Sequence, residues 1–251
     1  MLRDDGVSYG DYLEQITYLI FLKMAFEYSQ PPYNRDVGIP EEYNWKSLTD
    51  RTGAELESHY LALLRDLSMR KGLLGQIFAK AQNKIQDPAK LSRLVAMIDE
   101  TKWTRLGVDV KGDIYEGILE KNAEDTKSGA GQYFTPRALI QAIVECVRPQ
   151  ADTLIADPAA GTGGFLLAAY SYLEKHANLN AEQKVRLKNG TFFGNEIVAN
   201  TRRLCLMNLF LHGIGEMDGD SPISSDDSLV APSTRKVTWF WPIRHSVKKA
   251  A

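Results

Sequence analysis

Hydrophobic residues recur at helical spacing through the first half of the chain. From Asp11 to Tyr28 they lie nearly all round a projected helix, which is typical of a deeply buried one. Between Ala54 and Met69 the apolar side chains repeat with a helical period, at Leu56, Tyr60, Leu63, Leu64 and Leu67. Similar patterns over Ala89–Ile98 and Ile114–Leu119 predict two further helices. Since no stretch alternates like a strand, the sequence predicts an all-helical N-terminal domain over residues 1–127.

The pattern changes at about residue 128, where Ser128 to Gly131 form a joint of small residues. The predicted elements that follow are a helix from Pro136 to about Val147 with Thr135 as its N-cap, a strand at Thr153–Ala156, a loop at Asp157–Gly164, a helix at Phe165–Lys175, a strand at Thr191–Asn195 and a helix to about His212. Strand, glycine loop, helix and strand begin a doubly wound sheet. The predicted fold class is therefore α/β, with a Rossmann-like sheet over residues 128–237 that is incomplete at the C-terminus.

The strongest chemical signal is the string Asp-Pro-Ala-Ala-Gly-Thr-Gly-Gly-Phe at residues 157–165. Its candidate binding residues are Asp157, Ala159, Gly161, Thr162, Gly163 and Gly164. Glycines let a backbone turn sharply off a strand and approach a ligand closely, and the helix that follows offers N–H groups to a carboxylate or phosphate. The leading aspartate can pair with a cation. S-adenosylmethionine (SAM) carries both a carboxylate and an ammonium; the alternative is an ordinary glycine turn between strand and helix.

Glu196 follows the second predicted strand, beside the glycine loop in a doubly wound sheet. A carboxylate there can bridge the two hydroxyls of a ribose. The gap from the loop is longer than the usual Rossmann spacing, and the polar stretch from His176 to Gly190 accounts for it as an insertion. Taken alone, Glu196 fits a solvated strand end better than a ribose-binding acid, and the glycine loop beside it reverses that preference.

A third candidate segment precedes the first strand and runs from Gly131 to Pro136. It contains Gln132, Tyr133, Phe134 and Thr135, and its two aromatic rings beside a helix start could form one wall of a cofactor pocket. Plain packing between domains is the alternative explanation of the same residues.

These segments occur in an order that resembles the modification subunits of type I restriction-modification systems, which are N6-adenine DNA methyltransferases. The strings that carry the resemblance are Gly131–Pro136, Asp157–Phe165, Gly194–Glu196 and Asn208–Gly213. The helical segment Tyr12–Met24 also resembles their N-terminal domain, so the similarity extends to about Lys236. It implies a SAM-dependent methyltransferase sheet and transfer of a methyl group from SAM to adenine N6 in DNA.

The resemblance also assigns roles and partners. Phe134 and Thr135 belong to the segment at the methionine end of SAM, Glu196 matches the acid that binds the ribose, and Asp227 matches an acidic position near the adenine of SAM. The implied partners are DNA, a specificity subunit that reads sequence and a restriction subunit that cuts, with two modification subunits for each specificity subunit.

Composition narrows the remaining possibilities. The net charge of -2 does not favour unaided binding to phosphates, so a local patch or another subunit would have to grip DNA. Cys146 and Cys205 are expected to be buried reduced thiols of a cytoplasmic protein. The four histidines lack metal-ligand spacing, so no metal site is expected. The most apolar run, Ile16–Phe26, is too short to span a bilayer and contains Lys23, so no membrane association is expected.

The family pattern breaks near the C-terminus. These enzymes require a strand ending in Asn-Pro-Pro-Phe or Asn-Pro-Pro-Tyr, whose acceptors hold the N6 amino group of a flipped adenine and whose ring stacks on the base. The sequence contains no such tetrapeptide, so no catalytic residue is assigned and this chain is expected to be inactive. A SAM-binding scaffold without chemistry, and a methyltransferase acting on protein or RNA, are the alternative functions.

The genetic code suggests an origin for the tail at residues 238–251. Codons for Thr238 to Val247, with Arg as CGN and Ser as TCN, can be read in the frame that starts one base earlier. That frame can spell Asp-Met-Val-Leu-Ala-Asn-Pro-Pro-Phe-Gly, an apolar strand leading into the missing loop. The tail is therefore interpreted as frameshifted near Lys236 to Thr238; a divergent tail of no significance is the alternative.

Overall fold

The computed structural model describes residues 9–106, 135–216, 219–230 and 239–240. The chain divides into two compact units. The first, called here the helical unit, comprises Met1–Ser128 with Glu216–Asp220, and the second, the sheet unit, comprises Gly129–Gly215 with Ser221–Ala251. The predicted helix at Ile114–Leu119 lies outside the described residues.

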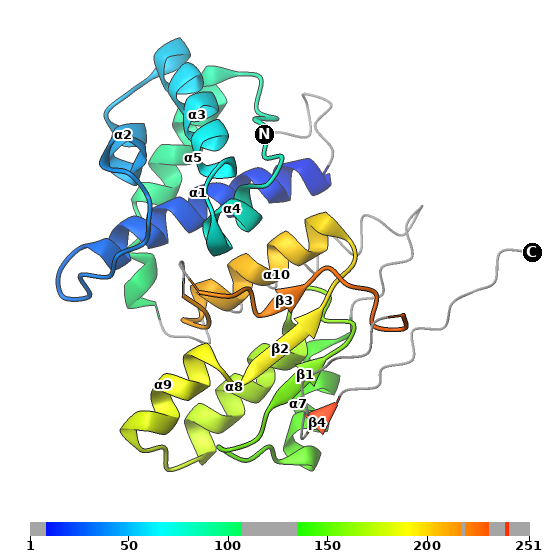
Figure 1. Cartoon of the computed structure of the whole chain (residues 1–251). Coiled ribbons are helices and arrows are strands. Elements are labelled where there is room, and N and C mark those ends of the chain that lie inside the picture. The colour runs from blue at the N-terminus through cyan, green and yellow to red at the C-terminus, as the bar shows by residue number, and fades with distance from the viewer. Residues whose placement is uncertain (1–8, 107–134, 217–218, 231–238, 241–251) are drawn as a thin grey trace, which may run out of the picture. The chain divides into compact units, whose positions relative to one another are not determined.

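The described part of the helical unit consists of helices and connecting turns (Figure 1). The helices are α1 (Tyr9–Ser29), α2 (Trp45–Thr49), α3 (Gly53–Ser68), α4 (Gly72–Phe78) and α5 (Pro88–Asp99), with 3-10 turns η2 (Glu41–Tyr43) and η3 (Trp103–Arg105). The five predicted core residues of α3 are all buried, and α1 is buried nearly all round. Both patterns therefore predicted burial correctly. The short helix α4 was not predicted, although it packs against α3.

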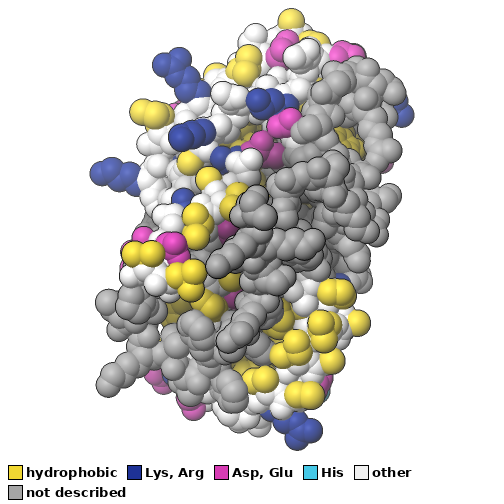
Figure 2. Space-filling model, turned by 90° about the vertical axis from the view of Figure 1, so that its right-hand side faces the viewer, with side chains coloured by type: hydrophobic (Ala, Val, Ile, Leu, Met, Phe, Trp, Pro, Cys, Tyr) yellow, Lys and Arg dark blue, Asp and Glu magenta, His cyan; other side chains and the backbone are white. Residues whose placement is uncertain are grey.

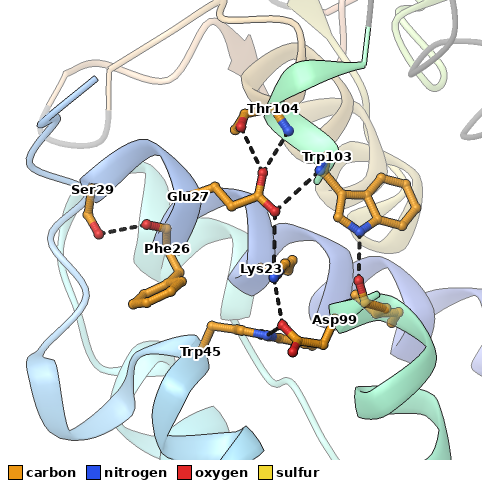
Figure 3. A network of polar contacts seen from close by, with 9 residues as sticks. Lys23, Phe26, Glu27, Ser29, Trp45, Asp99, Trp103 and Thr104 are labelled. Atoms are coloured by element: carbon orange, nitrogen blue, oxygen red, sulfur yellow. Dashed lines mark hydrogen bonds and ion pairs between the residues drawn. The ribbon is translucent and has the colours of Figure 1, made fainter. Parts of the chain in front are cut away.

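A polar cluster ties the helical unit together around Lys23 of α1, which is only 3% exposed (Figure 3). Its Nζ lies 2.6 Å from Asp99 Oδ1 and 3.6 Å from Glu27 Oε1. The same Asp99 oxygen accepts a hydrogen bond from Trp45 Nε1 at 2.8 Å. Glu27 accepts hydrogen bonds from the backbone N–H groups of Trp103 and Thr104 and from the Thr104 hydroxyl. Buried charge is thus paired and hydrogen-bonded, as a low-dielectric interior requires.

The sheet unit is built on four parallel-paired strands in the order β3-β2-β1-β4. They are β1 (Ile155–Asp157), β2 (Phe192–Asn195), β3 (Ile223–Ser224) and β4 (Trp239–Phe240). Ile155 is paired with Phe192 on one side and with Trp239 on the other, so β1 is internal. This arrangement confirms the predicted doubly wound α/β fold, and each predicted strand starts one or two residues too early.

The helices of the sheet unit are α7 (Arg137–Val147), α8 (Gly164–His176), α9 (Ala181–Asn189) and α10 (Ala199–Leu211) (Figure 1). Helices α8 and α9 connect β1 to β2, and α8 packs against α7 and β1. Helix α10 connects β2 to β3 in the same direction along the sheet. Because such crossovers are right-handed, α8 and α10 lie on one face of the sheet.

Two local expectations about α7 were wrong. Thr135 is not its N-cap: Pro136 holds that position, because its ψ of 135° is not helical and the first helical residue is Arg137. Cys146 is exposed rather than buried, because α7 turns Ile140 and Val144 inward and leaves Cys146 on the other side. Cys205 is buried, as expected.

The polar stretch between His176 and Gly190 was expected only as an insertion. It contains α9, which starts with a capping box in which Asn180 and Gln183 each bind the other's backbone N–H. Among the described residues, no helix is both long and apolar enough to cross a membrane, and no group of three side chains is placed to hold a metal ion.

Candidate cofactor-binding site

The glycine loop begins at Asp157, the last residue of β1. The buried Asp157 side chain accepts a hydrogen bond through Oδ1 from the Ala159 N–H at 3.0 Å. The Ala160 N–H donates to the carbonyl of Asn195, the last residue of β2, at 2.9 Å. These bonds hold the loop at the carboxyl ends of two neighbouring strands, where open α/β sheets bind ligands.

Two glycines set the shape of the loop. Gly161 has φ of 54° and Gly163 has φ of 88°, a region that residues with a Cβ rarely adopt. The Gly163 N–H donates to the Ala160 carbonyl at 2.8 Å and closes a tight turn. A Cβ at Gly163 would lie 3.0 Å from Cys205 Sγ of α10, so the loop backbone packs directly on that helix. Gly164 then starts α8, whose N-terminal N–H groups suit an anion.

Glu196 is brought onto the glycine loop. It follows β2 directly and is half-buried. Its Oε2 accepts a hydrogen bond from the Gly161 N–H at 3.1 Å, and its Oε1 accepts one from the Val198 N–H at 2.8 Å. The carboxylate therefore lies at the end of β2, where its two hydrogen bonds join the glycine loop to the start of α10. A ligand held by the loop would lie next to it.

The electrostatics of the site are dominated by two acids in close proximity. Burial raises the pKa of the Asp157 carboxyl to about 6; the Ala159 N–H partly opposes this shift, and the negative Glu196 adds to it. Burial also raises the pKa of the Cys205 thiol, with Asp157 and Glu196 contributing in the same direction. A cation next to Asp157 would therefore be favoured, because it would replace a proton that the buried carboxyl otherwise retains near pH 6.

The segment after β3 also reaches the loop. The Ser228 hydroxyl donates to the Pro158 carbonyl at 2.7 Å, and Asn195 Nδ2 donates to the Asp226 carbonyl at 3.2 Å. Asp227 is exposed, and its Oδ1 accepts the Leu229 N–H at 2.9 Å, which shapes its own turn. The structure thus places the predicted Asp227 in a segment bonded to the glycine loop.

The other predicted residues fall into two groups. Gln132, Tyr133 and Phe134 lie outside the described residues, so their predicted role remains a prediction. Thr135 is half-buried and precedes Pro136, the N-cap of α7. Ala159 is exposed and Thr162 half-buried in the loop itself.

Sequence reasoning missed several residues at the site. Ser228 and Asn208 bond to the loop, and Ile197, which follows Glu196, is exposed. Exposed large apolar side chains of the sheet unit are Leu139, Val185, Ile197, Val198, Leu229 and Val230. In the view of Figure 2, hydrophobic side chains form a group at the lower right of the visible face and are more scattered elsewhere on it. For Asn208 a signal existed: it is a polar residue within the apolar run from Cys205 to Leu211.

The strand order locates the site in the sheet. From β1 the chain proceeds through β2 to β3 on one side, and β4 then pairs with β1 on its other side. The strand order therefore reverses between β1 and β4. Asp157 lies at the carboxyl end of β1, beside this reversal point, which is where doubly wound sheets open a ligand-binding crevice.

Comparison with known proteins shows the family to which the chain belongs. Residues 107–242 match the N-6 DNA Methylase family, and residues 1–98 match the HsdM N-terminal domain. The type I restriction enzyme StySJI methylase subunit of Salmonella typhimurium is 40% identical over 238 residues, covering 91% of this chain and 44% of that protein. The EcoKI methylase subunit of Escherichia coli is 39% identical with the same coverage. The chain thus spans less than half the length of these relatives.

A solved structure supports the fold. The modification subunit of a type I restriction enzyme from Vibrio vulnificus YJ016 superposes with a TM-score of 0.70 at 23% identity, over 87% of this chain and 51% of that one. The resemblance inferred from the sequence is confirmed: the chain belongs to the N-6 DNA methylase family, and its two matches, in this order, are those of a type I restriction-modification methylase subunit.

Proposed function

We propose that the chain binds SAM at the glycine loop and forms the cofactor-binding part of an adenine-N6 DNA methyltransferase. The observation that carries the proposal is the placement of two carboxylates, Asp157 and Glu196, on either side of a positive-φ glycine turn at the strand-order reversal. A Cβ at Gly163 would lie 3.0 Å from Cys205 Sγ, so the glycine turn packs tightly on α10 and keeps its shape only with a residue that lacks a Cβ.

The residues present suit the chemical groups of SAM. Asp157 would pair with the ammonium, the N-terminus of α8 would receive the carboxylate, and Glu196 would accept hydrogen bonds from both ribose hydroxyls. Asp227, in the segment bonded to Pro158, would lie near the adenine, and the segment Gln132–Thr135 would line the methionine end. When bound, SAM supplies the methyl group.

The raised pKa of Asp157 predicts that SAM affinity depends on pH. Above about pH 6 the carboxyl is ionised and can pair with an ammonium; below it, a proton must first leave. We therefore expect affinity to fall between pH 7 and pH 5, approaching about tenfold for each pH unit below the pKa. Isothermal titration calorimetry over this range measures the effect. Asp157→Asn should bind weakly with little pH dependence, and an equally steep profile in that variant would assign the titration elsewhere.

Glu196→Gln is expected to weaken SAM binding about tenfold or more, because hydrogen bonds to a charged acceptor contribute about 1.5–3 kcal/mol. The same variant should bind a SAM analogue lacking both ribose hydroxyls as well as the parent does. Calorimetry with both ligands forms a double-mutant cycle. Glu182→Gln, exposed on α9, is the matched control. Losses that simply add would exclude the ribose role.

The proposed partners follow from the family. A solved structure from a study of complex assembly in a type I restriction-modification system shares the fold, with a TM-score of 0.69 at 24% identity. By extension this chain would act on DNA in the cytoplasm, with a specificity subunit that reads sequence, a restriction subunit that cuts, and two modification subunits for each specificity subunit. The net charge of -2 agrees with DNA binding in which other subunits supply part of the contacts to phosphates.

A scaffold that binds SAM without chemistry is the second candidate, favoured by the missing Asn-Pro-Pro-Phe sequence. β4 pairs with β1 at the reversal point, and its carboxyl end is the position where that sequence would be useful. This chain is therefore expected to transfer no methyl group to adenine, since its sequence lacks the tetrapeptide that would align N6 with the methyl donor. A chain carrying the alternate frame and its downstream sequence should transfer it.

The measurement is tritiated methyl transfer from SAM to unmodified DNA, with a purified specificity subunit present. The frame-restored chain with its loop asparagine changed to alanine is the control and should be silent. Activity of the chain as written would overturn the interpretation of residues 238–251. If the frame-restored chain binds SAM but transfers no methyl group to DNA, the frameshift hypothesis is wrong.

A further inference from the structure

Helix α10 packs against the glycine loop at Gly163. Cys205, Asn208 and Leu209 lie at helical spacing on one face of α10, and all three are buried. Cys205 Sγ and Leu209 Cδ2 are the nearest atoms to a Cβ built on Gly163, at 3.0 and 3.6 Å. The Asn208 side chain, on the same face of α10, is 1% exposed.

Asn208 fixes the orientation of one peptide group in the loop. Its Nδ2 donates to the Thr162 carbonyl at 3.0 Å across 46 residues of sequence. The N–H of the same peptide, on Gly163, donates to the Ala160 carbonyl at 2.8 Å. The Thr162–Gly163 peptide is thus held at its oxygen by α10 and at its nitrogen by the turn. Because a trans peptide directs its carbonyl and N–H in opposite directions, the two bonds reinforce each other.

The other end of the Asn208 amide is its Oδ1, which is buried and accepts no hydrogen bond from any residue that the structure describes. A buried acceptor without a donor destabilises a fold, and an apolar side chain of similar size would fill this all-buried segment of α10 without that penalty. The asparagine is therefore poorly explained by packing alone, whereas its single bond to the loop has an evident consequence.

We propose that Asn208 is a positioning residue of the SAM site, holding the Thr162 carbonyl against α10 so that the glycine turn keeps its binding shape. This inference rests on the proposed function. Without the amide donor, the peptide next to Gly163 can rotate, and the Thr162 carbonyl can turn towards a bound ligand. An outward carbonyl oxygen would oppose the SAM carboxylate electrostatically, while the glycine φ values permit such a rotation at little cost.

The test compares Asn208→Leu with Met207→Leu, a buried control on the same turn of α10. In the ligand-free chain, Asn208→Leu should raise the hydrogen-exchange rate of the Gly163 amide about tenfold, and it should weaken SAM binding about tenfold by calorimetry. Its thermal unfolding midpoint should stay close to that of the parent, because the leucine removes the unpaired Oδ1 while the half-buried Thr162 carbonyl, which loses its donor, can turn to solvent. Met207→Leu should leave the exchange rate and the affinity unchanged.

A purely structural asparagine would behave differently, lowering the midpoint while affinity follows only the loss of folded protein. Unchanged Gly163 exchange, or full SAM affinity in Asn208→Leu, would overturn the proposal. If the leucine variant fails to fold, Asn208→Ala provides the same two readouts, with a lower midpoint expected from its cavity. If the parent itself binds no SAM, the proposed function fails, and the exchange rate of Gly163 still decides whether Asn208 orders the loop.

Discussion

Gly163→Ala is expected to weaken SAM binding about 100-fold, since a Cβ at positive φ costs about 1–3 kcal/mol of strain and about 1.4 kcal/mol corresponds to tenfold in affinity. Gly163 has φ of 88°, and the new Cβ would lie 3.0 Å from Cys205 Sγ. Both problems are relieved only if the turn changes shape, which moves the backbone that would hold the ligand. Calorimetry on the purified chain measures the loss.

Gly190→Ala is the matched control for this substitution. Gly190 has an ordinary negative φ of -149°, and an added Cβ would meet Arg186 atoms only at 3.8 Å, which is normal van der Waals contact. The same chemical change there should leave SAM affinity within about twofold of the parent, because surface substitutions away from a site have small effects. Equal affinities for the two alanine variants would mean that the loop at Gly163 does not form the site.

Lys23→Ala is expected to destabilise the helical unit by about 3 kcal/mol or more, because removing one partner of a buried ion pair leaves the other charge uncompensated. Glu27 is 8% exposed and would keep its hydrogen-bond donors but lose the cation with which it forms an ion pair among the described residues. The alanine would also leave a cavity beside Trp45. Chemical denaturation followed by tryptophan fluorescence measures the change.

Two further variants separate charge from volume at this position. Lys46→Ala, exposed on α2, should change the free energy of unfolding by less than about 0.5 kcal/mol. Lys23→Met keeps most of the side-chain volume and should lose less stability than Lys23→Ala. If all three variants unfold at the same denaturant concentration, the Lys23 cluster contributes nothing measurable to the helical unit.

Local sequence signals predicted those parts of the fold whose physics is local. The helical period of α3 identified its five buried residues, and the Asp157–Gly164 loop was recognised because turn, acid and helix start are adjacent in sequence. Helix α9 escaped detection because only Leu187 is buried, so its apolar period is too weak. Its capping box at Asn180 and Gln183 was the available signal.

Features that depend on contacts between distant parts of the sequence could not be predicted in the same way. The bond from Asn208 to Thr162 joins residues on different helix and loop segments, and nothing in a single sequence pairs them. The N-cap of α7 was assigned to Thr135 from residue preference, whereas the non-helical ψ of Pro136 decides the start of the helix. For Cys146, an apolar neighbourhood suggested burial, but the side of α7 that faces inward depends on how α7 packs against α8.

The two cysteines differ in solvent exposure, so one of them can be labelled selectively. A maleimide dye reacts with accessible thiolates, and Cys146 on α7 is exposed, whereas Cys205 is fully buried with a raised thiol pKa. Since the chain contains only these two cysteines, a single fluorophore would attach to the sheet unit without any mutation. Helix α7 packs on α8, the helix that starts at the glycine loop, so such a label provides a ready spectroscopic reporter for ligand titrations.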